Sequence, residues 1–322
     1  MRFLKRHFLL LGIVLVAVGA WLAPGAGIFL GDHGAKTAAI VIIFFMSGVT
    51  IPLGRLGEDL RKWRCHALIQ GFSLGLIPLA VWYTSGWVAE GSVRYGIFVV
   101  AVVPTTISSC VVLTDAAGGR TPTALINAIG GNLLGIFLSP LLLALMIEGE
   151  GRLSGSRIGG TILRLCAIVV LPFILGKVFA RGFPALSRRV ERIQPVAAQL
   201  AILLVVFCAF ADSRDPLREN AGEMWGAFAY LAAGHLVFVA VLTGLGAALR
   251  LGVSDATAVV ICGSQKTLAL GIPLCEAFFR GSDDMSVGVL IVPLVFYHVF
   301  QLAAAGFLVA YWSGRNRGQM GC

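Results

Sequence analysis

The stretch VVICGSQKTLALGIPL (residues 259–274) is apolar at both ends, yet its centre reads Gly263, Ser264, Gln265, Lys266, Thr267. A charged side chain at the centre of a bilayer costs about 2.5–3.5 kcal/mol on insertion scales, so a lysine there usually has a partner or a function. This stretch therefore decides the interpretation of the chain, provided that the surrounding sequence is that of a membrane protein.

The composition is that of an integral membrane protein. Of the 322 residues, 58% are hydrophobic and 13% are charged, and the mean hydropathy is +0.90. A soluble domain carries roughly 25% charged residues. The apolar residues come in runs of about 20, the length that a helix needs to cross a bilayer, and the alternating strands of a membrane barrel are not seen. The expected fold class is all-α integral membrane.

The charge and the cysteines exclude several other classes. The net charge of +9 comes from basic residues that lie between apolar runs, so it is interpreted as a topology signal and no nucleic-acid partner is expected. The seven cysteines lie mostly inside apolar runs without CxxC spacing, which indicates buried small side chains with neither a disulfide framework nor a zinc site. No cofactor and no certain metal site are predicted.

The apolar runs predict ten helices in two sets of five. The first set covers roughly 8–24, 37–53, 65–86, 94–116 and 121–147, and the second roughly 158–180, 192–212, 224–249, 254–278 and 286–312. The amino terminus resembles a signal peptide, but nine further spans favour a first membrane helix held inside by its basic residues. The expected domains are a first five-helix repeat (1–147), a second five-helix repeat (158–312) and a cytoplasmic tail (313–322).

The distribution of basic residues predicts the orientation. With the amino terminus inside, sixteen lysines and arginines fall in inside segments and seven in outside segments, as the positive-inside rule favours. The predicted location is the cell inner (plasma) membrane, multi-pass, with both termini cytoplasmic. Because five is odd, the two halves have opposite orientations, which is the arrangement of inverted-repeat transporters.

The fourth helix of each half is interrupted by polar residues and proline. In VVPTTISSCVVLTDAAGG (residues 102–119), Pro104 removes a helix hydrogen bond, and the ninth span has Pro273 as well as its polar centre. Corresponding broken helices in two inverted halves point to a transport site, although Ser and Thr can also bond to their own backbone. The candidate ion- or substrate-binding residues are Thr105, Thr106, Ser108, Ser109, Ser264, Gln265, Lys266 and Thr267.

Five more polar residues lie inside predicted spans. Amides often join membrane helices by hydrogen bonds, and a histidine in a helix is more often a packing residue than a ligand. A structural role therefore stays open for each of them beside a role in binding. They are Gln70, Asn127, Asn132, His235 and His298.

Four motifs together resemble the bile acid:sodium symporter superfamily, specifically its bacterial bile-acid-symporter-like branch. They are FFMSGVTIPLGRL (44–56), PTTISSCVVLT (104–114), NAIGGNLLGIFLSPLL (127–142) and GSQKTLALGIPL (263–274). The resemblance covers nearly the whole chain. It implies ten helices, inverted five-helix repeats, a core and a panel domain, and helices four and nine that break and cross near the midplane, where ions bind. It also implies that substrate enters the cleft between the domains.

The resemblance carries over only in part. The family's polar crossover in helix four matches Thr105, Thr106, Ser108 and Ser109, its helix-three glutamine matches Gln70, and a polar residue of helix five falls near Asn132. Cys110 stands where the family has an asparagine. In helix nine, sodium-coupled members resemble the pattern acidic, any, Gly, any, Gln, Asn, whereas this chain has Ile261 and Lys266 at the first and last positions.

This departure changes the expected ion chemistry. Sodium prefers oxygen ligands, so losing the carboxylate and gaining an ammonium disfavours sodium at this position. The hypothesis is that Lys266 occupies the place of the ion as a tethered charge, and that transport is coupled elsewhere, with a proton as one option beside sodium. The alternative is that Lys266 contacts an anionic substrate directly.

The predicted function is a secondary active transporter that moves an organic anion or similar small solute by alternating access. The alternative is a membrane regulator of ion (calcium) homeostasis without its own coupled substrate. An enzyme is not expected, because there is no HExxH motif and the membrane serines lack a placed base. The expected partners are a small-molecule solute and the lipid bilayer, and the oligomeric state is open, with a homodimer as one arrangement.

Overall fold

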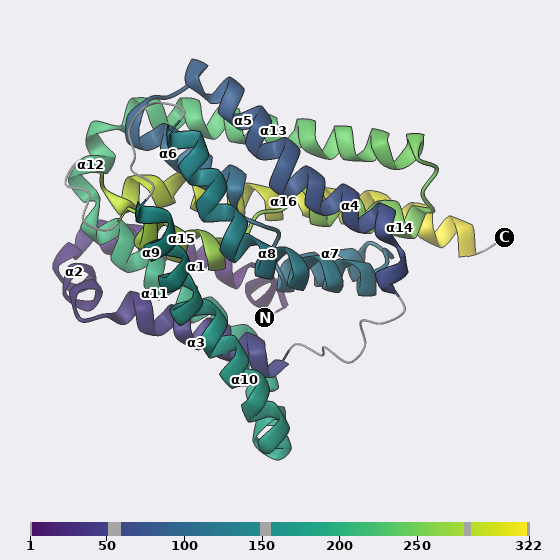
Figure 1. Cartoon of the computed structure of the whole chain (residues 1–322), viewed down its shortest axis with the longest axis horizontal. Coiled ribbons are helices and arrows are strands. Elements are labelled where there is room, and N and C mark those ends of the chain that lie inside the picture. The colour runs from purple at the N-terminus through teal and green to yellow at the C-terminus, as the bar shows by residue number, and fades with distance from the viewer. Residues whose placement is uncertain (1, 51–58, 149–155, 280–284, 321–322) are drawn as a thin grey trace. The chain divides into compact units, whose positions relative to one another are not determined.

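A computed structural model describes residues 2–50, 59–148, 156–279 and 285–320, and these residues form helices without a β-strand (Figure 1). This confirms the all-α fold class. The helices are α1 (Arg2–Leu22), α2 (Pro24–Asp32), α3 (Ala35–Thr50), η2 (Asp59–Arg61), α4 (Trp63–Gly71), η3 (Phe72–Leu76), α5 (Ile77–Thr84), η4 (Ser85–Trp87), α6 (Gly91–Val102), α7 (Ser108–Ala116), α8 (Thr121–Glu148), α9 (Ser156–Leu165), η5 (Cys166–Val170), α10 (Leu171–Gly182), α11 (Pro184–Asp212), α12 (Arg214–Glu219), α13 (Ala221–Ala248), α14 (Val253–Ser264), α15 (Leu268–Phe278) and α16 (Val287–Met320).

Seven helical stretches within the described residues are long and apolar enough to cross a membrane. They are Trp63–Trp87, Thr121–Ile147, Gly159–Gly182, Pro184–Asp212, Ala221–Ala248, Val253–Phe278 and Val287–Trp312. The pair α1 and α2, which meet at a bend of 100°, adds an eighth if the two helices together form one span. Pro24 stands at the first position of α2, and since it has no N–H it begins a helix well but cannot continue α1.

Two further predicted spans are not single helices long enough to cross a membrane. The predicted span 37–53 appears as α3, which has 16 residues, and residues 51–53 lie outside the described ranges. The predicted span 94–116 is divided between α6 and α7. The structure thus supports a multi-pass membrane protein with seven or eight long spans, and the count of ten stays a prediction.

Some predicted features fall outside the described residues or differ from them. Residues 51–56 of the first family motif lie outside, as do Arg55, Arg152 and Arg280, which contributed to the charge bias. The predicted tail from residue 313 continues the helix α16, which runs to Met320. The helices α2 and α12, which connect longer helices, were not expected from the apolar pattern.

The chain divides into two compact units, each assembled from separate segments. Unit 1 comprises Met1–Ile51, Ser156–Ala221 and Ile272–Ile291. Unit 2 comprises Pro52–Gly155, Gly222–Gly271 and Val292–Cys322. Each unit contains segments from both predicted repeats. The two compact units are therefore not the same divisions of the chain as the two predicted five-helix repeats.

In unit 1, α3 packs closely against α10 through two glycines. A Cβ atom built on Gly48 would lie 2.1 Å from the carbonyl oxygen of Phe173, and one built on Gly176 would lie 2.1 Å from the carbonyl oxygen of Phe45. No Cβ atom fits at such a distance, so these two positions need glycine. Small residues are what allows membrane helices to approach so closely.

Unit 2 is built around α14. Every residue of α14 from Thr257 to Ser264 is buried, and α14 packs against α4, α7 and α8. By contrast, only 17% of the most apolar stretch of helix α13 is buried. The polar centre at residues 263–267 is therefore enclosed by protein.

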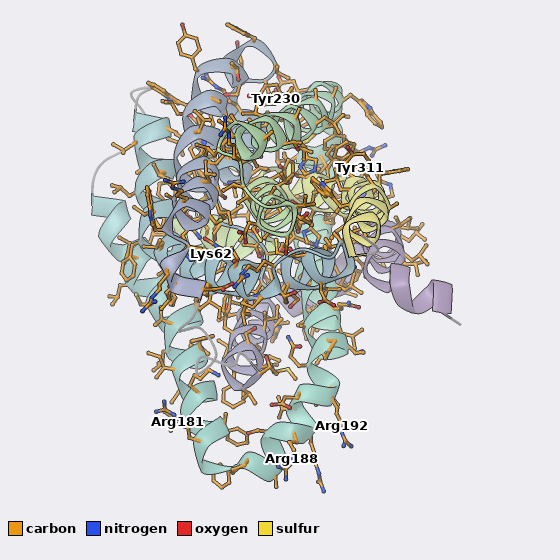
Figure 2. All side chains as sticks on the ribbon, turned by 90° about the vertical axis from the view of Figure 1, so that its right-hand side faces the viewer. Lys62, Arg181, Arg188, Arg192, Tyr230 and Tyr311 are labelled. Atoms are coloured by element: carbon orange, nitrogen blue, oxygen red, sulfur yellow. The ribbon has the colours of Figure 1, made fainter. Side chains whose placement is uncertain are left out.

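A network of ion pairs holds one end of unit 2. Arg120 donates hydrogen bonds to both carboxylate oxygens of Asp59, at 2.6 and 2.8 Å, and Thr123 donates a third at 3.0 Å. The Arg120 hydrogen bond lowers the pKa of the Asp59 carboxyl below its ordinary value, against desolvation, which raises it. Lys62, labelled in Figure 2, pairs with Asp255 at the start of α14. The network fixes the first half of the ninth predicted span to the third and fifth.

Candidate functional site

The fourth predicted span is interrupted at the residues that its sequence singled out. α6 ends at Val102 and α7 begins at Ser108. Val103 has extended backbone angles (φ −73°, ψ 147°), as a residue before proline prefers. Pro104 then has no N–H with which to continue the helix.

The ninth predicted span is interrupted by three residues. α14 ends at Ser264, Gln265 is extended (φ −84°, ψ 151°), and α15 begins at Leu268. The expectation that Pro273 takes part in this break is wrong, because Pro273 lies inside α15. A membrane helix tolerates an internal proline where neighbouring groups satisfy the backbone group that it frees.

The two interruptions meet inside unit 2. The Thr267 N–H donates a hydrogen bond of 2.9 Å to the carbonyl oxygen of Pro104. We call residues 103–107 and 265–267 the crossover centre. Non-helical backbone at membrane depth is tolerated only where other groups satisfy it, so the hydrogen-bond partners of this centre decide what it can do.

Lys266 is completely buried, and its ammonium group is surrounded by oxygen atoms. Its Nζ donates to the carbonyl oxygens of Ser73 (2.6 Å), Ala101 (2.7 Å) and Val103 (2.9 Å), with the Ser73 hydroxyl at 3.2 Å. An ammonium group has three N–H donors and no acceptor. Three carbonyl partners therefore match the charged form, whereas the lone pair of a neutral amine would face an oxygen.

The position of these carbonyls explains why a cation fits there. Ala101 and Val103 lie at the carboxyl end of α6, where carbonyls have no partner within the helix and the helix dipole is negative. Ser73 belongs to the π-helical turn η3. Lys266 thus caps α6 and ties the ninth predicted span to the third and fourth, and no carboxylate is among its hydrogen-bond partners in the described residues.

Two side-chain amides hold the crossover centre. Asn132 of α8 donates to the carbonyl oxygen of Thr105 at 2.8 Å. Gln301 of α16 accepts from the Lys266 N–H and donates to the Lys266 carbonyl, both at 2.7 Å. Sequence reasoning found Asn132 but missed Gln301. An amide in the apolar run of the tenth span, the signal that identified Gln70, would have found it.

The free carbonyls beside the breaks are also capped by side chains. Ser139 of α8 donates to the Val102 carbonyl at 2.8 Å, and Tyr297 of α16 donates to the Ser264 carbonyl at 2.8 Å. With the bonds above, each of the five consecutive carbonyls of residues 101–105 has a donor. The carbonyl groups at the break in the fourth span are therefore all hydrogen-bonded, as buried backbone carbonyls require.

A second polar cluster gathers around Gln265. Its Oε1 accepts hydrogen bonds from the Thr106 hydroxyl (3.1 Å), the Ser109 hydroxyl (3.2 Å) and the Cys110 thiol (3.3 Å). Ser109 is half-buried, whereas Ser108 is exposed and lies outside the cluster. Of the serines and threonines predicted in the fourth span, Thr106 and Ser109 meet the ninth span through their side chains.

The two histidines contact the side chains of Tyr297 and Gln301, which bond to the backbone at the break in the ninth span. Tyr297 donates its only proton to Ser264, so His235 Nδ1, at 3.0 Å, must donate to the Tyr297 oxygen. His298 Nδ1 lies 2.9 Å from Gln301 Nε2 and accepts its second N–H. Both side chains are buried and have defined tautomers, and a role in binding stays a prediction for them.

The remaining predicted residues make hydrogen bonds within their own helix or to a neighbouring one. Gln70 donates to the Asn127 carbonyl at 2.9 Å, and Asn127 contacts His66 at 2.8 Å, so these amides join α4 to α8 apart from the crossover centre. The Ser264 hydroxyl bonds back to Val260 at 2.8 Å. The Thr267 hydroxyl accepts from the Ala269 N–H at 3.1 Å and so caps the start of α15.

Within the part of the chain that the structure describes, no three His, Cys, Asp or Glu side chains gather as a metal site would require. The oxygen-rich environment of the crossover centre instead surrounds the protein's own ammonium group. The site thus consists of one fixed positive charge, two non-helical backbone segments and a cluster of hydroxyl groups around Gln265.

Comparison with known proteins also indicates a membrane transporter. The profile of the SBF-like CPA transporter family matches residues 7–314. Sodium/bile acid cotransporter 7 of Danio rerio is 29% identical over 97% of this chain and 96% of its own length. Sodium/bile acid cotransporter 7 of Mus musculus is 27% identical over 95% and 92%, respectively.

A bacterial relative shows the same extent of similarity. Uncharacterized protein PA2026 of Pseudomonas aeruginosa is 29% identical over 98% of this chain and 95% of its own length. The names of the family and of its cotransporter members point to transport and not to catalysis. The matched region includes both broken spans and nearly all of the described helices. The chain belongs to the SBF-like CPA transporter family, within the bile acid:sodium symporter superfamily that its motifs resemble.

Proposed function

We propose that this protein is a secondary active transporter that moves a small organic anion or a similar solute by alternating access. The observation that carries the proposal is the crossover centre, where two broken spans meet and every freed backbone carbonyl of residues 101–105 has a partner. Discontinuous helices of this kind form the substrate and ion sites of many transporters. The residues proposed to bind are those around Gln265, namely Thr106 and Ser109, together with the neighbouring exposed Ser108.

We propose that residues 1–147 and 158–312 form two inverted five-helix repeats. The support comes from matching contacts in the two halves. The fifth predicted helix of the first half supplies Asn132 to clamp the fourth span, and the fifth of the second half supplies Gln301 to clamp the ninth. The same two helices supply Ser139 and Tyr297 to cap α6 and α14. Corresponding helices thus perform the same task in each half.

Lys266 is proposed to act as a tethered cation. All three of its N–H donors are matched by carbonyl oxygens, so none is left to bind a solute, which disfavours direct contact with an anionic substrate. Carbonyl oxygens are also suitable ligands for a hard metal cation. We infer that the ammonium fills the position that a mobile cation would otherwise occupy, and that sodium does not couple transport there. The coupling ion would then be a proton, or a cation that binds at another position.

The charge of Lys266 supports the choice of an anionic substrate. In the described part of unit 2, the buried carboxylate is Asp59, and its charge is matched by Arg120. The positive charge of Lys266 therefore has no buried carboxylate beside it. An interior with an uncompensated positive charge favours an anionic solute over a cationic one.

The test is solute flux into liposomes that contain the purified protein alone. A thermal-shift screen of organic anions with and without sodium first identifies a ligand, since binding to the native state raises its melting temperature. Uptake of that ligand against its gradient, unaffected by a sodium gradient but driven by another ion, supports the proposal. Sodium-driven uptake by the wild type that is retained in Lys266→Asn contradicts the tethered-cation role.

Binding without uptake would contradict the transport proposal and favour the regulatory alternative. Lys62→Ala serves as a control for loss of a lysine away from the crossover centre, because Lys62 lies in the ion-pair network at the end of unit 2. Its uptake should keep the ion dependence of the wild type even if its stability falls.

We propose an inner-membrane location with both termini cytoplasmic, supported by the excess of basic residues in the segments assigned to that side. Labelling of single introduced cysteines with a membrane-impermeant thiol reagent would test it in a background without the native cysteines. Protection of the carboxyl terminus in intact cells is expected, and labelling there would refute the orientation. Light scattering of the purified protein would show whether it is a monomer or a homodimer.

A further inference from the structure

The turn between α10 and α11 in unit 1 carries a dense group of basic side chains. Residues 177–192 contain five basic side chains and one acidic side chain, Glu191. Figure 2 shows Arg181, Arg188 and Arg192 on the two arms and the tip of this hairpin, directed away from the ribbon. Arg189 is exposed as well. We define the four arginines Arg181, Arg188, Arg189 and Arg192 as the basic tip.

The basic tip has no ion-pair partner among the residues that the structure describes. A carboxylate three or four residues away on the same helix can pair with an exposed arginine and offset its charge. Here the one acidic neighbour is Glu191, three residues after Arg188, and it stands against five basic side chains in residues 177–192. An excess of positive charge is therefore presented outward by both arms of the hairpin.

The length of α11 places this charge at the surface of a bilayer. α11 has 29 residues, which corresponds to about 43 Å at 1.5 Å per residue. Its apolar part, residues 193–211, is about 28 Å long and fits a hydrocarbon layer of about 30 Å. Residues 184–192 then extend about 13 Å beyond it, across and past a headgroup layer of roughly 5–8 Å.

The exposed face of α11 continues from apolar residues into the basic tip. Ile193, Val196 and Leu200 are 58%, 55% and 52% exposed, and Leu186 is 45% exposed. With Arg189 these residues follow steps of three and four, which places them on one face of the helix. Exposed apolar side chains in a membrane helix face acyl chains, so Arg189 lies on the lipid-facing side, about 6 Å beyond Ile193.

We propose that the basic tip is a binding site for the headgroups of anionic phospholipids. Guanidinium groups bind phosphate through two parallel hydrogen bonds, and Arg189 lies where the phosphate of a lipid packed against Ile193 and Val196 would be. Arg188 and Arg192, one turn apart on α11, add positive charge beside it. The continuous apolar face favours a lipid over a soluble phosphate, because only a lipid covers both parts. This inference does not depend on the transport proposal.

The test measures the melting temperature of the purified full-length protein with added lipid. The probes are phosphatidylglycerol and phosphatidylcholine with identical acyl chains, and glycerol 3-phosphate as the soluble headgroup. We expect phosphatidylglycerol to raise the melting temperature more than phosphatidylcholine does, with the difference decreasing as salt increases. Each lost arginine should weaken phosphatidylglycerol binding about five-fold, so R188Q/R189Q/R192Q should weaken it about a hundred-fold.

Single substitutions give a matched comparison. R189Q should lower the affinity for phosphatidylglycerol, whereas R250Q, at an exposed arginine in the turn after α13, should not. R189K, which keeps the charge, should retain most of the effect and guards against loss of folding in the neutral variant. Equal stabilisation by both lipids, an unchanged response of R188Q/R189Q/R192Q, or the same shift from glycerol 3-phosphate alone would overturn the proposal.

Discussion

Removing the Lys266 side chain tests the description of the crossover centre most directly. In Lys266→Ala, the carbonyl oxygens of Ser73, Ala101 and Val103 lose their common donor. A buried group left without its partner costs about 1–3 kcal/mol, so three cost about 3–9 kcal/mol. The fold no longer has to desolvate an ammonium group, which offsets several kcal/mol of this. A net loss of about 3 kcal/mol is a conservative expectation.

This loss can be measured as a fall in melting temperature. At roughly 2–4 °C per kcal/mol, Lys266→Ala in detergent should unfold about 6–12 °C below the wild type, followed by tryptophan fluorescence. Lys177→Ala, which removes the same atoms from a half-buried lysine of α10, should change the temperature much less. A Lys266→Ala protein that unfolds within about 2 °C of the wild type would refute the claim that the ammonium satisfies these carbonyls.

A second measurement on the same variant distinguishes lost packing from a lost cation. The atoms removed from Lys266 correspond to propylammonium, so this ion, or sodium, should raise the melting temperature of Lys266→Ala and leave the wild type unchanged. A cation at ten times its dissociation constant would restore about 1.4 kcal/mol. Lys266→Met fills the space without a charge and should not respond. Equal responses of both variants would contradict the tethered-cation interpretation.

Three further predictions concern single positions. Gln301→Leu removes the hydrogen bonds to the backbone N–H and to the carbonyl of Lys266 and should destabilise the protein by about 2 kcal/mol, read as a lower melting temperature and reduced solute uptake. Gly48→Ala should cost about 1–3 kcal/mol, because its Cβ atom would meet a carbonyl oxygen at 2.1 Å. Gly160→Ala meets nothing within 4 Å and lies inside α9, so it should cause no loss of stability and should raise it slightly. Because Arg120 lowers the pKa of Asp59, this carboxylate stabilises the fold above its unfolded pKa of about 3.9, and the stability is lost as the pH falls through the folded value. The difference in unfolding free energy between the wild type and Arg120→Gln should therefore be largest at pH 7 and should disappear below the folded pKa of Asp59. A difference that does not change with pH would contradict the ion pair.

The membrane class and both interruptions could be predicted from the chain, because each rests on local chemistry. Apolar runs define helices regardless of their neighbours, and Pro104 with its adjacent hydroxyls breaks a helix wherever it is placed. The break at residues 265–267 was found for the same reason, since a lysine and a glutamine stand in an apolar run. Pro273 was misjudged because the tolerance of an internal proline depends on surrounding groups that a sequence does not show.

The partners within the crossover centre could not be predicted, because they are backbone atoms from distant helices. No residue type marks the carbonyls of Ser73, Ala101 and Val103 as ligands of Lys266, since every residue has a carbonyl. Gln301 was overlooked for a different reason: a single amide among aromatic and apolar residues was given no weight. The separation of Gln70 and Asn127 from the centre likewise depends on helix packing, which spacing along the chain does not encode.

A charge that is covalently part of the protein has an electrical consequence. A mobile ion is released at the end of each half-cycle, but the ammonium of Lys266 cannot leave the protein. If the crossover centre changes its depth in the membrane field, the return step without solute carries a positive charge, and a dianion bound together with one coupling cation or proton cancels that charge in the loaded step. At about 2.3 kcal/mol per charge per 100 mV, the return step alone would respond to the membrane voltage. Presteady-state currents that appear only without solute, and that disappear in Lys266→Met, would be its signature, whereas currents retained in that variant would rule it out.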